Sequence, residues 1–422
     1  MIVCLVSWGP LFRSALDKLW MHSEGLSSIG QWAQLQTLSD LIGAPVGAGI
    51  GIGVTILAAQ TPLSSQRILL VASGALGLLI TLPLLLLTLF FYQDIGRWTG
   101  LESIHHHGLV MAAIGGWLGT LTIQISAFLL GINQHFKALL IMIVSSLPTF
   151  LTLSIGVALH TNSLMEKTLL ATVLSGLAFI IGFLFFIYQT LKQSSQSKTQ
   201  FKKALHELSK FIYAGFAIGI LTPLSMMIAR STIASHLDWN SVGMATALWR
   251  VSDWILCIAQ AVLFFHFLPL LSKEAGINLI PRIKRLVIQV FIPSLFGFFI
   301  LFIFRKSIFS HLYSDQLQID WEVCLLFWSG DACRVLAIIF LLALYILKGT
   351  KTISFVEFFS QPLLALLLIL GAANSLIGVG KAHLLTYTLY ALLCLLGMMG
   401  LGSPFFYKSK KYLPTRSKKL SV

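Results

Sequence analysis

The chain has 422 residues, of which 57% are hydrophobic and only 10% are charged. An ordinary soluble domain carries about 25% charged residues, and the mean hydropathy of this chain is +0.87. These values exclude a soluble domain that carries a single membrane anchor. The formal net charge of +14 does not predict nucleic-acid binding, because the basic residues lie in short loops and at the C-terminus, where the positive-inside rule places them.

Apolar segments long enough to cross a membrane recur along the whole chain. A helix needs about 20 mainly apolar residues to cross roughly 30 Å of hydrocarbon, so we predict an all-α membrane protein with about twelve transmembrane helices. The predicted spans cover residues 2–20, 31–59, 68–92, 108–131, 138–160, 168–191, 211–231, 241–271, 286–304, 323–347, 352–373 and 382–406. The first span is short and contains Arg13, Asp17 and Lys18. If it does not cross, eleven helices remain and the N-terminus lies outside.

The longest polar segment, QSSQSKTQFKKALHELSK, divides the predicted helices into two groups of six. The predicted parts are an N-terminal six-helix bundle at 1–192, a basic cytoplasmic linker at 193–210, a C-terminal six-helix bundle at 211–407 and a basic cytoplasmic tail at 408–422. With a cytoplasmic N-terminus, the inner loops and the tail contain 19 lysines and arginines, whereas the outer loops contain five. This bias predicts that both termini are cytoplasmic.

The two predicted bundles share a short sequence pattern. Ser39-Asp40 in the second span and Ser252-Asp253 in the eighth are 213 residues apart, which is about half of the chain. The same alignment places Gln60 opposite Lys273 at the ends of these two helices. Because the two helices are also the second in their respective groups, we predict an internal repeat with parallel topology. The second span also contains a run of glycines beside Pro45, which predicts close helix packing and a bend.

Ionisable side chains within the predicted spans are the main candidates for function. Each one costs about 2.5–3.5 kcal/mol on insertion scales, so it marks a candidate site. They are Arg13, Asp17, Lys18, Asp40, Arg230, Arg250, Asp253, Asp331, Arg334 and Glu357. A purely structural interpretation pairs neighbours one turn apart, such as Arg250 with Asp253 or Asp331 with Arg334. It also lets Arg230 end its helix and extend to the outer interface.

Taken together, these charges predict a polar cavity between the two halves. Charged groups on the first, second, eighth and tenth spans are disfavoured against lipid, and pairing within a shared cavity lowers their desolvation cost. Several cations in one cavity suit an anionic substrate, because guanidinium groups bind phosphate oxygens in pairs.

Several functional classes lack support in the sequence. There is no P-loop, no HExxH and no GxSxG, and the outer loops are too short to contain a catalytic domain. ATP-driven transport by this chain and hydrolase chemistry are therefore unsupported. The five cysteines form no CxxC pair, and neither a metal site nor a cofactor is predicted. We therefore predict a transporter that works by alternating access, not an enzyme.

Two helices carry a resemblance to a known family. The segments APVGAGIGIGVTILAAQ (44–60) and LWRVSDWILCIAQAVLFFHFLPLLSK (248–273) resemble the second and eighth helices of the Wzx-type O-antigen and polysaccharide flippases. The resemblance implies the fold of the multidrug/oligosaccharidyl-lipid/polysaccharide exporter superfamily. It also implies that an undecaprenyl-pyrophosphate-linked oligosaccharide crosses the bacterial inner membrane. The first helix is shorter than is usual in that family.

The resemblance also suggests partners and roles. The expected partners are the lipid-linked oligosaccharide, membrane lipids and polysaccharide polymerase or assembly proteins. We expect Arg250 and Arg334, with Arg13 or Lys18, to hold the pyrophosphate. Asp40 is the acid with the fewest local partners and is the expected coupling site. The expected ion-pair or coupling group is completed by Asp17, Asp253 and Asp331.

Three alternatives remain open at the level of sequence. The first is a multidrug or cation antiporter of the same superfamily, which is expected to show unpaired acids in the cavity of one half and few cations. The second is a lipid II-type flippase, although that group typically carries two further helices. The third is a non-transporting scaffold of a polysaccharide assembly complex.

Overall fold

The computed structural model describes residues 2–101, 106–161, 163–192, 197–209, 211–267, 279–315, 317–346 and 350–400. Every regular element in these ranges is a helix. The first half of the chain contains α1 (Ile2–Glu24), α2 (Leu26–Pro45), the π-helix η1 (Val46–Gly51), α3 (Ile52–Gln60), α4 (Leu63–Phe90), α5 (Tyr92–Thr99), α6 (His106–Gly131), α7 (His135–Ala158), α8 (Leu164–Lys192) and α9 (Ser197–Ser209). The second half contains α10 (Ile212–His236), α11 (Trp239–Ala261), the π-helix η2 (Val262–Phe267), α13 (Leu279–Leu286), the π-helix η3 (Val287–Phe291), α14 (Ile292–Ile303), α15 (Arg305–Leu312), α16 (Trp321–Ile346), α17 (Thr350–Ile369), the 3₁₀ turn η4 (Ala372–Asn374) and α18 (Leu376–Met399).

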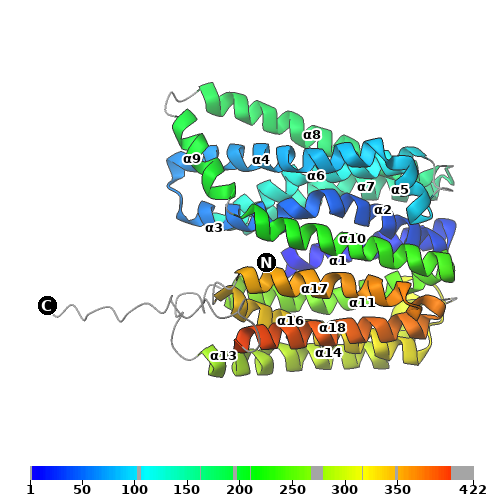
Figure 1. Cartoon of the computed structure of the whole chain (residues 1–422). Helices are drawn as coiled ribbons and strands as arrows, with labels where there is room; N and C mark the ends of the chain where they lie inside the picture. The colour runs from blue at the N-terminus through cyan, green and yellow to red at the C-terminus, as the bar shows by residue number, and fades with distance from the viewer. Residues whose placement is uncertain are drawn as a thin grey trace.

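The prediction of an all-α, multi-pass membrane protein is confirmed. Within the described residues, eleven helices are long and apolar enough to cross a membrane. The first helix, α1, is continuous over 23 residues despite Pro10, a length of about 35 Å at 1.5 Å per residue. It begins at the end of the bundle where α18 finishes (Figure 1). Including α1, the described residues contain twelve helical segments of membrane-spanning length.

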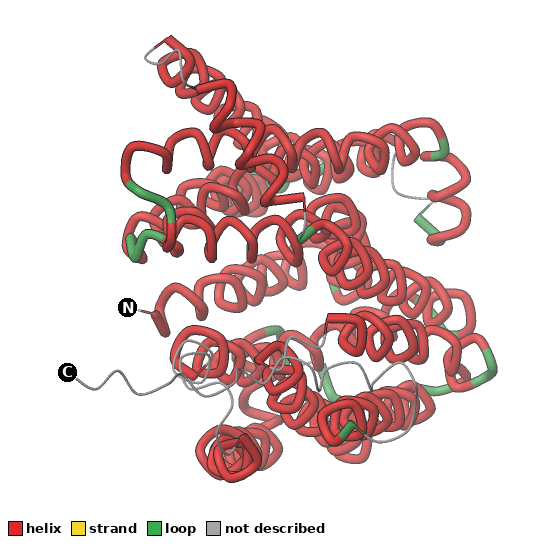
Figure 2. Tube along the Cα trace, turned by 60° about the vertical axis from the view of Figure 1, so that its left-hand side comes forward, coloured by secondary structure: helices red, strands yellow, loops and turns green. Residues whose placement is uncertain are grey.

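The helices lie in two groups that follow the order of the chain. In Figure 1, α4, α6, α7 and α8 form the upper group, and α11, α14, α16 and α18 form the lower one. Helices α1, α2, α10 and α17 lie between them. Figure 2 shows from another side that the loops drawn in green between the helices are short. Within the predicted linker 193–210, α9 packs its buried Leu208 against Leu69 and Ala72 of α4. The predicted tail 408–422 lies outside the described residues.

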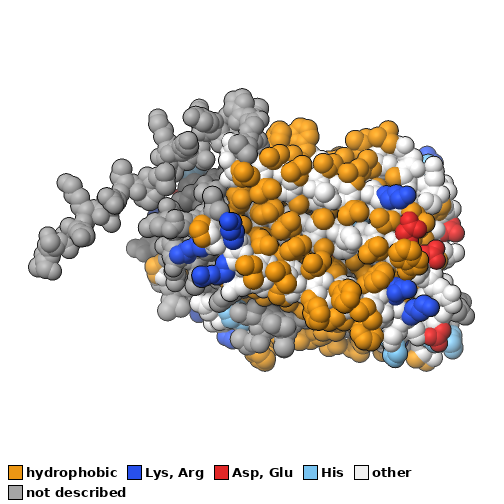
Figure 3. Space-filling model, turned by 90° about the horizontal axis from the view of Figure 1, so that it is seen from below, with side chains coloured by type: hydrophobic (Ala, Val, Ile, Leu, Met, Phe, Trp, Pro, Cys, Tyr) orange, Lys and Arg blue, Asp and Glu red, His pale blue; other side chains and the backbone are white. Residues whose placement is uncertain are grey.

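Large apolar side chains are exposed on the outer faces of many helices. Figure 3 shows hydrophobic side chains across the middle of one face, with charged side chains gathered at its two ends. On α14 the exposed side chains Ile292, Phe296, Phe299 and Ile303 are three or four residues apart and so share one helix face. A helix face of this kind requires hydrocarbon around it, which agrees with the membrane assignment.

Glycines allow α10 to pack directly on the end of α2 and on the π-helix η1 that follows it. A Cβ atom on Gly215 would lie 2.3 Å from the Cα atom of Gly49, and one on Gly219 would lie 2.4 Å from the Cα atom of Pro45. The two backbones are therefore in contact, as the glycine run predicts. The helix changes from α to π geometry at this contact, in Val46–Gly51. The eighth span changes in the same way at Val262–Phe267, and the ninth does so at Val287–Phe291.

Replacement of Gly215 by alanine tests this contact. Because the added methyl group meets backbone atoms that cannot turn aside, we expect Gly215→Ala to destabilise the protein by about 1–3 kcal/mol. Gly119→Ala is the matched control, because nothing lies within 4 Å of a Cβ atom there. The measurement is the midpoint of thermal unfolding in detergent. Equal midpoints for the two variants would contradict the close contact.

Candidate functional site

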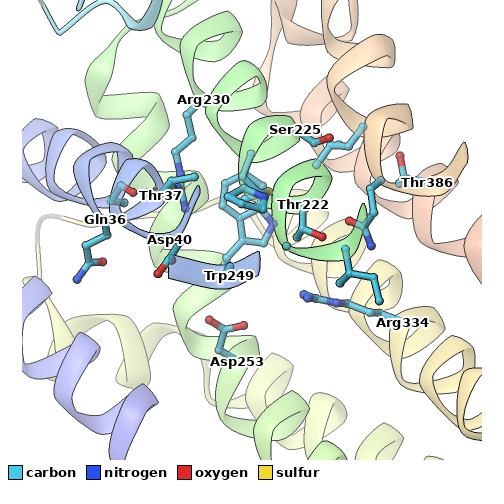
Figure 4. A pocket seen from close by; sticks show the side chains of 18 of the residues that line it. Gln36, Thr37, Asp40, Thr222, Ser225, Arg230, Trp249, Asp253, Arg334 and Thr386 are labelled. Atoms are coloured by element: carbon cyan, nitrogen blue, oxygen red, sulfur yellow. Dashed lines mark hydrogen bonds between the residues drawn. The ribbon is translucent and has the colours of Figure 1, made fainter. Parts of the chain in front are cut away.

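A cavity of about 470 Å³ lies between the two groups of helices. Its wall is formed by α1, α2, η1, α10, α11, α16, α17 and α18. The charged side chains of the wall are Arg13, Asp40, Arg230, Arg250, Asp253 and Arg334. Figure 4 shows Gln36, Thr37 and Asp40 on α2 opposite Arg334 on α16, with Asp253 below Trp249 on α11. Arginines outnumber aspartates by four to two, so the lining carries an excess of positive charge.

The structure brings together five of the eight residues predicted for the site. Arg13, Asp40, Arg250, Asp253 and Arg334 all line the cavity. Asp17 and Asp331 are fully buried behind the wall. Lys18 does not line the cavity. Its Nζ atom donates a hydrogen bond to the carbonyl oxygen of His311 at 2.8 Å.

Arg250 joins the two halves of the protein. Its Nε atom donates to Asp17 Oδ2 at 3.1 Å, and its Nη2 atom donates to Gln36 Oε1. The expected local pair with Asp253 is therefore replaced by partners on α1 and α2. A buried guanidinium has five donors and needs several acceptors, and α1 and α2 supply two of them. Asp253 is left facing the cavity.

Arg334 is also paired differently from the local expectation. Asp331 accepts a hydrogen bond from His383 (Nε2 to Oδ1, 3.2 Å), so it is not the partner of Arg334. The guanidinium of Arg334 lies 5.2 Å from the centre of the Tyr387 ring, a cation–π contact that leaves its N–H donors available. Within the described part of the chain, neither Arg334 nor Arg13 makes a hydrogen bond or an ion pair. The guanidinium groups of Arg13 and Arg334 therefore line the cavity without an acidic partner among the described residues.

The expectation that Arg230 ends its helix is wrong. Helix α10 continues to His236, because Ser231 and Thr232 donate their hydroxyl protons to carbonyls one turn earlier and are compatible with helix here. Arg230 is consequently buried. It donates to the carbonyl oxygen of Ala33 at 3.0 Å and to the Thr37 hydroxyl, and it lies 5.6 Å from the centre of the Trp249 ring.

Polar contacts between the two halves gather at the end of the bundle where α1 finishes and α2 begins. Gln34 donates to the carbonyl oxygen of Met227 and to Ser231 Oγ, both at 3.0 Å. Trp254 donates to Ser14 Oγ at 3.2 Å. The contacts of Lys18, Arg230 and Arg250 described above lie at the same end. From there the cavity lining extends along α2 as far as Ala48 in η1.

The uncharged polar lining was missed at the level of sequence. Ala33, Gln36 or Thr37, Asp40, Ala44 and Ala48 follow one another at intervals of three or four residues along α2 and η1. Residues at this spacing lie on one face of a helix. Counting in steps of three or four residues in both directions from Asp40 would have predicted this face from the sequence. Helices α17 and α18 also contribute to the lining, with residues that include Gln361, Tyr387 and Tyr390. No comparable sequence pattern predicted these residues. The described residues contain no group of three or more side chains arranged to hold a metal ion.

Comparison with known proteins identifies solved structures with the same fold. No protein-family model matches the sequence, and no curated protein matches it. Solved structures do match. An inward-facing multidrug resistance MATE-family transporter of the MOP superfamily shares 14% identity over 92% of this chain and 94% of its own, with a TM-score of 0.71. The lipid II flippase MurJ in its inward closed conformation shares 14% identity over 94% of this chain and 87% of its own, with a TM-score of 0.68.

A MOP-superfamily transporter from Pyrococcus furiosus shares 13% identity over 94% of this chain and 93% of its own, with a TM-score of 0.67. The chain therefore has the fold of MOP-superfamily transporters. At these identities the similarity establishes the fold alone, because one fold serves several functions and the function resides in the site.

Breaking the cross-half pair of Arg250 and Asp17 by removing one partner should strongly destabilise the protein. Removing one partner, as in Arg250→Met, leaves a buried carboxylate uncompensated and should cost about 3–5 kcal/mol of unfolding free energy. The double variant Asp17→Leu/Arg250→Met should cost less than Arg250→Met alone, because no buried charge remains. The exposed pair of Arg97 and Asp94, with N–O distance 3.8 Å, is the control, and Asp94→Ala should change stability by about 0–1 kcal/mol. Equal effects at the two pairs, measured by unfolding in mixed micelles, would contradict this assignment.

Proposed function

We propose that the protein moves an oligosaccharide linked to undecaprenyl pyrophosphate across the bacterial inner membrane by alternating access. The observation that carries this proposal is the positive excess of the cavity lining, in which four arginines face two aspartates. A pyrophosphate is a multiply charged anion with several acceptor oxygens. Arginines bind such groups with two parallel hydrogen bonds, and the low-dielectric surroundings strengthen the attraction.

The arginines take different parts in this proposal. Arg334 and Arg13 contact the pyrophosphate, because they line the cavity and no acid within the described residues occupies them. Arg250 contributes positive charge while Asp17 and Gln36 hold its position. Lys18 has no part in binding, because it contacts His311 away from the cavity.

The rest of the lining suits a sugar. Gln36, Thr222, Ser360 and Gln361 offer hydroxyl and amide groups that both donate and accept hydrogen bonds. The polyprenyl chain stays in the surrounding hydrocarbon, where each buried CH₂ group contributes about 0.8 kcal/mol. Asp40 is exposed to the cavity and has no partner within the described part of the chain. We propose it as the acid that exchanges an ion with the cavity.

Transport measurements in proteoliposomes test the binding assignment. A fluorescently labelled undecaprenyl-pyrophosphate-linked oligosaccharide is added to one leaflet, and its appearance in the other leaflet is followed. Loss of one charge-assisted contact costs about 1.5–3 kcal/mol, so Arg334→Gln should slow the movement by about tenfold or more. Lys18→Gln removes the same charge outside the cavity and should transport at the wild-type rate. Unimpaired transport by both Arg334→Gln and Arg250→Ala would refute the site.

The cation antiporter is the second candidate, because the same fold occurs in a multidrug resistance transporter. A positively lined cavity repels an organic cation, so we expect cells that express the protein to retain ethidium as control cells do. Ethidium efflux that depends on Asp40 and Asp253 would favour the antiporter instead.

A non-transporting scaffold predicts a different result. In that case the variant Arg13→Gln/Arg334→Gln would still support the cell-surface polymer in cells, whereas we expect the polymer to be lost.

A further inference from the structure

Three buried side chains form a hydrogen-bonded row behind the cavity wall. The indole Nε1–H of Trp249 on α11 donates to Nδ1 of His383 on α18 at 3.3 Å. On the other side of the ring, Nε2 of His383 lies 3.2 Å from Oδ1 of Asp331 on α16. His383 and Asp331 are fully buried, and Trp249 is nearly so. Trp249 alone of the three also lines the cavity.

The indole fixes the protonation state of the imidazole. An indole N–H can only donate, so Nδ1 of His383 must accept and carries no proton. A neutral imidazole then carries its single proton on Nε2, from which it donates to Asp331. Asp331 accepts this bond through Oδ1, and with its carboxylate ionised the row as a whole holds one negative charge. One further proton would make it neutral.

The surroundings are built for this imidazole. A Cβ atom on Gly330 would lie 2.6 Å from Cδ2 of His383, so glycine leaves the space that the ring fills. The Phe327 ring stacks on the imidazole at 5.0 Å between centres, and the Tyr387 ring meets it edge-on at 4.7 Å. The second carboxylate oxygen of Asp331 is buried and has no hydrogen-bond partner within the described residues.

Charged and titratable groups surround the row on every helix packed against it. They are Arg334 on α16, Tyr387 and Tyr390 on α18, Arg250 and Asp253 on α11, Arg230 on α10, Glu357 on α17, Arg13 and Asp17 on α1, and Asp40 on α2. Arg250 is occupied by Asp17, and Glu357 accepts hydrogen bonds from Tyr390 and Gln361. Only Trp249 is found in hydrogen-bond contact with Nδ1 of His383 in the described part of the chain. A proton that arrives at Nδ1 therefore displaces that bond and no other.

We propose that His383 is a proton-binding site whose occupancy sets the position of Trp249 in the cavity wall. When Nδ1 takes up a proton, the imidazolium keeps its Nε2–H bond to Asp331, and the charge of the row changes from minus one to zero. The new Nδ1–H then faces the indole N–H, and two donors repel each other. The indole must turn away. When the proton leaves Nδ1, the Trp249 bond can form again.

The movement of Trp249 reaches the substrate site. The guanidinium of Arg230 lies over the indole ring and donates to Ala33 and Thr37 of α2, in the other half of the protein. A turn of the indole removes this support and alters both the cavity lining and a contact between the halves. Proton uptake at His383 is thereby linked to the change of access. This linkage rests on the proposed transport function, whereas the proton site itself does not.

Tryptophan fluorescence tests the proton site without any substrate, because a protonated imidazole beside an indole quenches its emission. The signal of Trp249 is the difference between the purified wild-type protein and Trp249→Phe, titrated from about pH 4 to pH 9 in nanodiscs. We expect this difference to follow a single-proton transition. His383→Gln should abolish it, because the glutamine amide can make both hydrogen bonds but cannot titrate. Asp331→Asn should shift it to lower pH, because the imidazolium loses its carboxylate.

Two control variants define the outcome. Asp40→Asn changes an acid of the cavity, and His206→Gln changes an exposed histidine on α9; both should keep the wild-type transition. A transition that persists in His383→Gln, or an Asp331→Asn transition at unchanged pH, would overturn the proposal. The size-exclusion profile of each variant confirms that the comparison is made between folded proteins.

Transport supplies the second arm. In proteoliposomes that carry the labelled lipid-linked oligosaccharide, an imposed pH gradient should accelerate the wild-type protein. His383→Gln should retain the rate measured without a gradient and lose the acceleration. If the wild-type protein moves no oligosaccharide at all, the proposed function fails while the fluorescence result still decides the proton site. If His383→Gln keeps the full acceleration, the linkage fails and the proposed function stands.

Discussion

The ion pair between Arg250 and Asp17 is the interaction on which the arrangement of the site depends. The hydrocarbon core of a membrane contains no water that could solvate a charged side chain. A charged residue within a span therefore needs a partner inside the protein. Asp17 lies on the first helix of the first half, and Arg250 lies on the second helix of the other half. Their contact therefore holds the two halves together, and it frees Asp253 to face the cavity.

The need of each charge for a partner inside the protein also explains why the cavity lining is positive. Acids are no fewer than arginines in and behind the wall, but the two do not lie equally close to the cavity. Two of the acids, Asp17 and Asp331, lie behind the wall, where a guanidinium and an imidazole respectively form hydrogen bonds with them. The arginines, by contrast, extend to the wall surface, because their long side chains can span an apolar layer and expose a charged end. An anion inside the cavity therefore meets cations first.

The shared fold makes the lining the feature that distinguishes function. The structures that match this chain include a multidrug resistance transporter and a lipid II flippase, so helix arrangement alone cannot select a substrate. In the proposed function the selection comes from guanidiniums without acid partners and from uncharged polar groups around them. The row of Trp249, His383 and Asp331 adds a way for a proton to act on the same lining.

The sequence by itself determined the membrane class, the positions of the helices and most of the charged residues that meet in the cavity. Long apolar runs admit no other structure in hydrocarbon, and charges within them have few places to lie. It also determined the close packing at the glycine run. The tertiary structure alone decided the partners, because a contact such as Arg250 with Asp17 joins residues far apart in the chain, whereas sequence spacing reveals only neighbours on one helix. His383 illustrates the same limit. A single histidine in an apolar helix predicts no role by itself. Its partners become known only when the fold places an indole from α11 and a carboxylate from α16 on either side of it.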